Sequence, residues 1–230
     1  MNNTYIISLG GSLVAPKEGK GRIDWKFLKN FRNLILKQVK RGKKFFIIVG
    51  GGMTTRNYIE AVKKVVKISN EDLDWLGIHS TRLNAHLLRT VLRDVAHPEI
   101  IKNPTFRLIS DKKVIVAGGW KPGFSTDYGA TMIAQEYGVK KVINLSDFDH
   151  VCDKDPRKYK DAKKFDEISW KDFRKLVGSK WIPGMSAPFD PIASQKGERL
   201  GLEVVIMNGK NLKNLERYLE TGKIKGTKIV

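Results

Sequence analysis

The chain has 230 residues, 41% of them hydrophobic and 29% charged, so it is long enough and apolar enough to bury a core. No apolar run approaches the roughly 18 residues of a membrane-spanning helix, and the first residues do not resemble a secretory signal peptide. The single cysteine, Cys152, excludes an internal disulfide framework. Composition therefore predicts a cytoplasmic globular protein without a membrane partner.

The net charge of +19 is the unusual feature of this composition. Such a charge attracts nucleic acids and phosphorylated metabolites. The basic residues are spread along the chain, however, and a lysine-rich solvated surface explains the charge equally well. No aromatic and basic recognition motif accompanies it, so charge-driven binding to RNA or DNA stays an alternative and is not the favoured interpretation.

Short apolar strands alternate with amphipathic helices along the chain. Strands are expected at residues 5–9, 45–49, 114–117, 141–145 and 204–207, with a last edge strand at 228–230. Helices are expected at residues 24–40, 54–67, 72–96 (with a break near 77), 127–137, 169–178, 190–200 and 212–219. Asp24 is a predicted N-cap, and Ser169 forms a predicted capping box with Asp172. This alternation predicts an α/β fold, a three-layer αβα sandwich around a mostly parallel central sheet.

No linker or repeat divides the sequence. We therefore expect residues 1–230 to form a single domain. Its two lobes, residues 1–125 and 126–230, are expected to meet near residue 125.

Three glycine clusters follow predicted strands: Gly10-Gly11, Gly50-Gly51-Gly52 and Gly118-Gly119. Ligands of open parallel sheets bind beyond the carboxyl ends of the strands. Glycine lets backbone N–H groups approach an anion there, and a following helix adds its positive end. Three such turns favour phosphate binding over turn geometry alone. Neither the Walker-A pattern nor the dinucleotide fingerprint occurs, so any phosphate site uses another scheme.

Charged side chains near these turns are the candidates for chemistry. Arg56 lies four residues after Gly52, where it either binds a phosphate or is a surface arginine. Asp127 either caps the helix that it begins or orients a lysine or a hydrated metal ion. Four carboxylates follow the strand at 141–145, and they either hold Mg²⁺ or a nucleotide or form a solvated loop: Asp147, Asp149, Asp153 and Asp155. The histidines show no metal-ligand spacing, so no resident metal site is predicted.

The order of these motifs resembles the amino acid kinase superfamily, and within it the UMP kinases of archaeal type. Residues 74–85 (DWLGIHSTRLNA) match the pattern D-x-x-G-I-x-x-T-R-x-N-A of that family. Residues 118–127 (GGWKPGFSTD) match its loop G-G-x-x-P-G-x-[ST]-T-D. Asp190-Pro191 and Gly226-Thr227 match two later dipeptides. The resemblance spans nearly the whole chain and implies the amino acid kinase fold.

The resemblance implies transfer of the γ-phosphoryl group of ATP to UMP, with Mg²⁺, to give UDP and ADP in pyrimidine nucleotide biosynthesis. It also implies direct in-line transfer and a homohexamer built from dimers. One alternative is a sibling kinase that phosphorylates isopentenyl phosphate, carbamate or an acyl-amino acid. Another is a non-catalytic relative that binds a nucleotide or an oxyanion.

The resemblance further implies roles for individual residues. Those expected at ATP are Ser8, Leu9, Gly10, Gly11, Ser12, Gly52, Arg56, Ser146, Cys152 and Asp155. Those expected at UMP are Gly51, Asp74 (at the ribose), Trp120, Lys121, Pro122, Gly123, Phe124, Ser125 and Thr126. Those expected to be catalytic are Arg56, Asp127, Gly10 and Gly11.

The sequence departs from the family pattern at two places. Ser8 stands where many superfamily kinases have a lysine, and Lys17, Lys20 and Lys121 are candidates for the missing cation. In the Asp-rich loop, His150 and Cys152 replace a glycine and a tyrosine of the pattern.

Overall fold

The structure, a computed structural model, describes residues 3–20, 22–156, 158–180 and 187–230. Seven strands among them form one sheet: β1 (Thr4–Leu9), β2 (Lys44–Val49), β3 (Val114–Ala117), β4 (Lys141–Ser146), β5 (Glu167–Ile168), β6 (Glu203–Asn208) and β7 (Thr227–Ile229). Their order is β3-β2-β1-β4-β6-β7-β5, and only the β6–β7 pair is antiparallel. The predicted mostly parallel sheet is confirmed.

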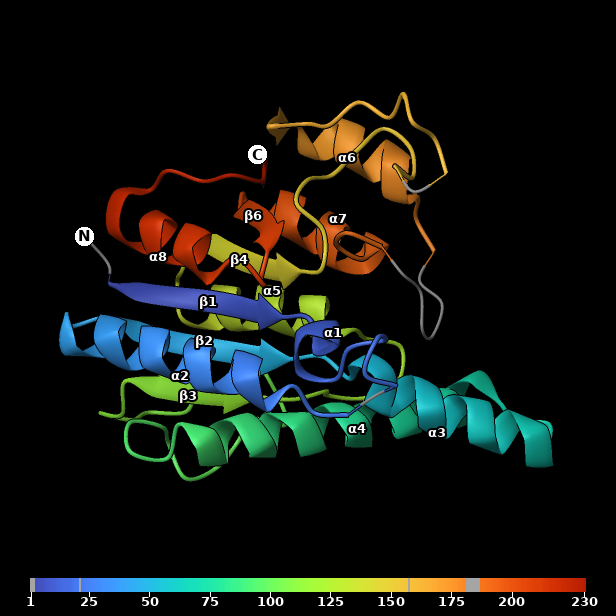
Figure 1. Ribbon diagram of the computed structural model, residues 1–230, viewed down its shortest axis with the longest axis horizontal. Coiled ribbons are helices and arrows are strands. Elements are labelled where there is room, and N and C mark those ends of the chain that lie inside the picture. The colour runs from blue at the N-terminus through green and yellow to red at the C-terminus, as the bar shows by residue number, and fades with distance from the viewer. Residues whose placement is uncertain (1–2, 21, 157, 181–186) are drawn as a thin grey trace.

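Helices cover both faces of this sheet (Figure 1). The described helices are α1 (Gly11–Val14), α2 (Trp25–Lys40), α3 (Gly52–Val65), α4 (Asn70–Val91), α5 (Thr126–Glu136), α6 (Trp170–Val177), α7 (Pro191–Arg199) and α8 (Leu212–Thr221). One hydrophobic core contains side chains of α2, α4 and α8, and the other contains side chains of α5, α6 and α7. The predicted three-layer arrangement is confirmed.

The strand sequences explain why there are two cores. Successive side chains of a strand point to opposite faces of the sheet. In β1, Ile7 belongs to the core under α2, α4 and α8, whereas Ile6 belongs to the core under α5 and α7. In β2, Phe45 and Phe46 divide in the same way. Strands buried on both faces are therefore apolar at nearly every position.

The N-caps that the sequence predicts are confirmed, but one helix differs from expectation. The Asp24 carboxylate accepts a hydrogen bond from Phe27 N at 2.9 Å, and Ser169 Oγ accepts one from Asp172 N at 3.1 Å. The helix expected at residues 72–96 is α4, which begins after Ser69, runs through Gly77 without a break and ends five residues early, at Val91. Gly77 packs close to α3 instead, because a β-carbon there would lie 3.6 Å from Thr55 Cγ2.

The expectation of a last edge strand is also wrong. The strand β7 lies between β6 and β5, and β5 forms that end of the sheet. Thr227 of β7 is completely buried, and its hydroxyl donates to Phe165 O at 2.5 Å and accepts from Val151 N at 2.9 Å. Two residues of β5 are too few for a periodic sequence pattern, so the covering strand was not predicted.

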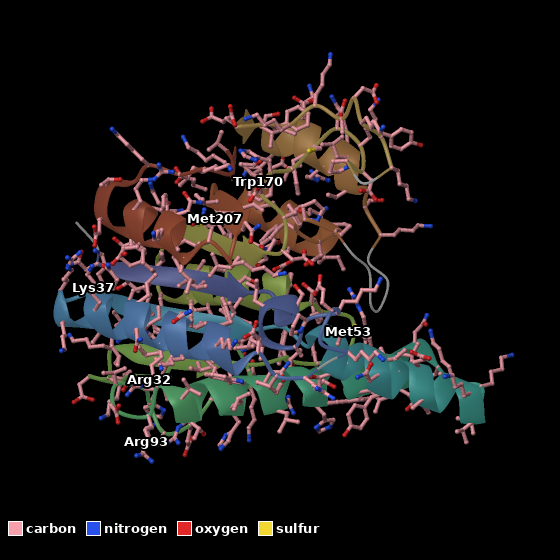
Figure 2. All side chains as sticks on the ribbon, in the orientation of Figure 1. Arg32, Lys37, Met53, Arg93, Trp170 and Met207 are labelled. Carbon is pink, nitrogen blue, oxygen red and sulfur yellow. The ribbon has the colours of Figure 1, made fainter. Side chains whose placement is uncertain are left out.

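The carboxyl ends of the central strands define one end of the molecule. Figure 1 shows α3 and the first half of α4 extending beyond the sheet at this end. Met53, labelled in Figure 2, begins this extension, and its N–H donates to Ala15 O at 3.0 Å. Among the described residues, none of the helices combines the length and apolar character that a membrane span requires.

Candidate functional site

The glycine turns after β1 and β2 lie against each other. A β-carbon on Gly11 would lie 2.1 Å from Gly52 N, and one on Gly52 would lie 2.2 Å from Gly11 O. Gly52 also has a φ of +59°, which side chains other than glycine rarely adopt. The two backbones therefore approach more closely than any other residue type permits.

A cavity of about 290 Å³ opens beside these turns. This volume lies near the lower end of the range for small-molecule sites. Nine of the expected site residues line it: Gly11, Ser12, Gly51, Gly52, Arg56, Asp74, Phe124, Ser125 and Thr126. They come from both glycine turns, from α3 and α4, and from the loop before α5. The structure thus brings five residues expected at UMP and four expected at ATP to one cavity, from segments more than 100 residues apart.

A larger hollow of about 570 Å³ lies on the surface between α2 and α8. Lys37 and Lys213 line it, and Lys37 already pairs with Glu216 at 2.7 Å. None of the glycine turns contributes to it, so we place the chemistry in the smaller cavity.

The motif on α4 that carries the family resemblance fastens the third glycine turn. Thr81 Oγ1 accepts a hydrogen bond from Gly119 N at 2.8 Å. Arg82 donates through Nε to Gly119 O at 3.0 Å and through Nη2 to Trp120 O at 2.9 Å. Partial burial lowers the pKa of Arg82. These contacts hold the beginning of the loop at residues 120–125.

Asn84, from the same motif, fastens the second glycine turn. Its Nδ2 donates to Gly50 O and to Gly51 O, both at 3.0 Å. One helix therefore sets the distance between two turns of the cavity. The T-R-x-N-A pattern of the sequence contains Thr81, Arg82 and Asn84, but their roles depend on contacts with distant turns that a local pattern does not report.

Asp74 closes the cavity on the side of the loop. Its Oδ2 accepts a hydrogen bond from Gly123 N at 2.7 Å. Partial burial raises the pKa of Asp74, and the Gly123 N–H acts in the opposite direction. Asp74 therefore already holds a hydrogen-bond donor in the position where a ribose hydroxyl is expected.

Aromatic rings stiffen the same loop. The Trp120 and Phe124 rings lie 5.2 Å apart, and Lys121 Nζ lies 4.3 Å from the centre of the Trp120 ring. Trp120, Lys121, Pro122 and Gly123 do not line the cavity among the described residues, and neither do Lys17 and Lys20. The structure therefore brings none of the three candidate lysines to the cavity wall.

A second group of polar side chains lies where β1, β4, α5 and α7 meet. Asp127 Oδ1 accepts hydrogen bonds from Ser8 Oγ at 2.7 Å and from Asn144 Nδ2 at 3.1 Å. The neighbouring Asp190 accepts from Ser125 Oγ and caps α7 through Ile192 N and Ala193 N. Asp127 therefore does more than begin a helix, whose N-cap is Ser125.

The two carboxylates of this group affect each other. Burial and then the charge of Asp190 raise the pKa of Asp127 to about 7, against the lowering effect of the Ser8 hydrogen bond. Burial raises the pKa of Asp190 as well. Asp190 was matched only as part of an Asp-Pro dipeptide, because its partner lies 63 positions away in the sequence.

We expect Asp127→Asn to flatten the dependence of stability on pH. A carboxyl with a raised pKa keeps its proton in the folded state, so wild-type stability should fall as pH rises from about 4 to about 7. The amide keeps an acceptor for Ser8 and Asn144 and cannot ionise. In urea denaturation the variant should exceed the wild type at pH 8 by on the order of 2 kcal/mol and match it at pH 4.5. Parallel pH profiles for the two proteins would refute the raised pKa.

Some expected ATP residues lie away from the cavity. Leu9 is completely buried, so it supports the turn and presents no side chain to a nucleotide. Gly10 N donates to Leu145 O at 2.9 Å and is therefore not free to bind a phosphate. Four more do not line the cavity among the described residues: Ser8 in β1, Ser146 at the end of β4, and Cys152 and Asp155 beyond it. Ser146 Oγ donates to Asn144 Oδ1 at 3.1 Å, and Cys152 pairs with Lys164 in a short bridge.

Glycine turns, an arginine and a buried carboxylate pair at the carboxyl ends of parallel strands define a phosphate-binding α/β protein. The sequence model of the Amino acid kinase family matches residues 3–208. The chain therefore belongs to the amino acid kinase family.

Several relatives of this chain carry the name uridylate kinase. A uridylate kinase of Staphylothermus marinus is 36% identical over 212 residues, which are 91% of each chain. A uridylate kinase of Methanospirillum hungatei is 33% identical over 98% of this chain and 94% of its own. The crystal structure of a uridylate kinase from Archaeoglobus fulgidus aligns with a TM-score of 0.80 and 26% identity, covering 98% of this chain and 99% of the other.

Proposed function

We propose that the protein transfers the γ-phosphoryl group of ATP to UMP, giving UDP and ADP. The observation that best supports this proposal is that two glycine turns, Arg56 and Asp74 surround one cavity, in a chain whose relatives are uridylate kinases. Backbone N–H groups and a guanidinium suit a phosphate, and a carboxylate suits ribose hydroxyls. An isopentenyl chain would place apolar groups against Asp74, so the same wall disfavours isopentenyl phosphate.

The reaction needs little covalent chemistry from the protein. A phosphate oxygen of UMP bonds to the γ-phosphorus of ATP, while the bond from that phosphorus to the β–γ bridging oxygen breaks and ADP leaves. The UMP phosphate is already anionic at neutral pH, so no general base is required. Arg56 and the positive N-terminus of α3 offset the repulsion between the two phosphates. The glycine turns position the acceptor for in-line attack.

We propose that Mg²⁺ accompanies ATP. No three His, Cys, Asp or Glu side chains gather as a metal cluster within the part of the chain that the structure describes. A cation bound mainly by substrate phosphates and one or two carboxylates suits such a site. Asp127, with Asp190 beside it, is the carboxyl that would hold this ion, and a bound cation would favour its ionised form over the protonated form of the free protein. When bound, Mg²⁺ neutralises charge on the donor phosphates.

We also propose the division into an acceptor lobe, residues 1–125, and an ATP lobe, residues 126–230. It is supported by the cavity lining, which runs from Gly11 to Thr126 in the sequence. Ser146, Cys152 and Asp155 of the second lobe would then serve ATP, together with Ser8 and Ser12 from the end of β1 in the first lobe.

On the basis of the family resemblance, we further propose a cytoplasmic homohexamer that acts in pyrimidine nucleotide biosynthesis. The helix α3 has no buried residue, and Tyr58 and Val65 on it are exposed, which supports self-association.

The test is a product assay with a panel of acceptors. Purified protein and Mg-ATP are incubated separately with UMP, CMP, AMP, isopentenyl phosphate and carbamate, and the products are read by phosphorus NMR. We expect UDP from UMP and little product from the other acceptors. Turnover of a different acceptor alone would move the specificity, and absence of turnover throughout would favour a non-catalytic binding protein.

Replacing Asp74 by asparagine should chiefly weaken UMP binding. The amide cannot accept ribose hydroxyls as strongly as a carboxylate, so we expect KM for UMP to rise about tenfold or more with kcat within threefold. The matched control is Asp72→Asn, an exposed carboxylate one half-turn away on α4. Steady-state kinetics with ATP saturating separates the two constants. An unchanged KM would remove Asp74 from the acceptor site.

A further inference from the structure

Thr55, in the first turn of α3, carries a polar atom without a partner. Its Oγ1 is buried and forms no hydrogen bond with any described residue. Only Gln38 Oε1, on α2, shares this state among the described side chains. Burying a hydroxyl without a partner costs free energy, so such a group in a folded protein calls for an explanation. Thr55 also lines the candidate acceptor cavity.

The geometry of α3 explains why the hydroxyl lacks its usual partner. Helical serine and threonine often donate to the carbonyl four residues earlier. Ser80, Thr90 and Thr221 do so, at 2.7, 2.9 and 2.8 Å. For Thr55 that carbonyl belongs to Gly51, and it accepts from Asn84 Nδ2 at 3.0 Å instead.

The hydroxyl lies directly against the second glycine turn. A β-carbon built on Gly51 would lie 1.8 Å from Thr55 Oγ1. Any side chain at position 51 would therefore displace the hydroxyl. The glycine at this position and the threonine one turn later form a single packed unit on the cavity wall.

The surroundings of this unit favour an anion. Arg56 is the next residue, is exposed and lines the same cavity. The N-cap of α3 is Gly51, which provides no side-chain acceptor for the first N–H groups. Met53 N in this turn donates to Ala15 O, and the helix dipole makes this end of α3 positive. The carboxylate on the cavity wall, Asp74, is held by Gly123 N on the loop side.

We infer that Thr55 Oγ1 donates a hydrogen bond to the phosphate of the acceptor nucleotide, as a binding residue beside Arg56. The inference rests on the proposed function, because it names the phosphate of UMP as the acceptor of this bond. Threonine occupies two rotamers in helices, so the hydroxyl can turn without movement of the backbone. The bound phosphate then satisfies a group that the free protein leaves unpaired.

The experiment compares UMP binding by calorimetry for the wild type, Thr55→Val, Thr55→Ser and Thr54→Val. Valine keeps the branched shape and removes the hydroxyl, serine keeps the hydroxyl, and Thr54 is a neighbour that does not line the cavity. We expect Thr55→Val to weaken UMP binding about tenfold. Thr55→Ser and Thr54→Val should stay within threefold of the wild type. The melting temperature of ligand-free Thr55→Val should equal or exceed that of the wild type, because no hydrogen bond is lost.

Each other outcome is informative. Wild-type UMP affinity in Thr55→Val would overturn the inference, and so would equal losses in Thr55→Val and Thr54→Val. A lowered melting temperature with unchanged affinity would assign the hydroxyl a structural role, through a bound water. If the wild type itself does not bind UMP, the proposed function fails. The hydroxyl is then tested with inorganic phosphate, whose binding must weaken in Thr55→Val but not in Thr54→Val.

Discussion

Replacing Arg56 by alanine should lower kcat/KM for UMP by about 10³-fold without unfolding the protein. Arg56 lines the cavity from the start of the second turn of α3, four residues after Gly52. It is exposed and pairs with no carboxylate in the described part of the chain, so its charge is free for a ligand. A planar guanidinium binds two phosphate oxygens at once, which positions the reacting group as well as neutralising it.

Two further variants make this prediction specific. Arg56→Lys keeps the positive charge but loses the planar guanidinium that binds two phosphate oxygens, so it should retain only part of the wild-type rate. Lys63→Ala removes an exposed positive charge from the last turn of the same helix and should change kcat/KM less than twofold. All three variants should melt within about 2 °C of the wild type, since surface changes have small effects on stability. Activity of Arg56→Ala within threefold of the wild type would mean that the arginine is a surface residue.

The second large effect is expected at Gly11, where alanine should cost at least about 3 kcal/mol of stability and abolish turnover. The added β-carbon would lie 2.1 Å from Gly52 N and 2.5 Å from Gly50 C. Both atoms are backbone, held by β2 and by Asn84, so neither can move aside cheaply. Relief requires the two turns to separate, which would also open the phosphate-binding wall.

A second glycine provides the matched control. Gly129 lies within α5, and a β-carbon there would meet no atom within 4 Å. Alanine in a helix interior is favoured over glycine, so Gly129→Ala should stabilise the protein by up to about 1 kcal/mol. Urea denaturation of both variants gives the comparison. If Gly11→Ala unfolds at the same urea concentration as the wild type, the close packing of the turns is wrong.

Much of the fold follows from local patterns in the sequence. The runs Tyr5–Leu9 and Phe45–Val49 are apolar and end at glycines, and both are strands in the predicted places. Asp24 and Ser169 cap helices as their spacing predicts. Short elements such as α1 and β5 were missed, because four and two residues carry no periodicity.

The sequence misled where tertiary contacts override a local preference. Gly77 suggested a break in a helix, yet α4 continues through it and packs there against Thr55 of α3. The last strand reads as an edge, yet pairing with Glu167–Ile168 places it inside the sheet. The resemblance to the amino acid kinase family is confirmed. It indicated a function and candidate site residues, which hydrophobic periodicity does not report.

In the candidate site, too, local sequence patterns predicted some features, and contacts between distant residues were not predicted. Glycine clusters at strand ends predicted a phosphate-binding wall, and Gly11, Gly51 and Gly52 line one cavity. The contacts of Asp127 with Ser8 and Asn144 join residues 119 and 17 positions apart, and no local pattern reports them. The hydroxyl of Thr55 is unpaired, and the Gly51 carbonyl four residues earlier accepts from Asn84. Only the folded structure reveals this contact.

The most direct test of the central claim is a crystal structure of the protein with UMP. The account predicts the UMP phosphate beside Gly51, Gly52 and Arg56, and the ribose hydroxyls on Asp74. The Asp74 carboxylate should then exchange its hydrogen bond from Gly123 N for bonds from the ribose. UMP bound outside this cavity, or bound within it with no contact to Arg56 or Asp74, would contradict the account.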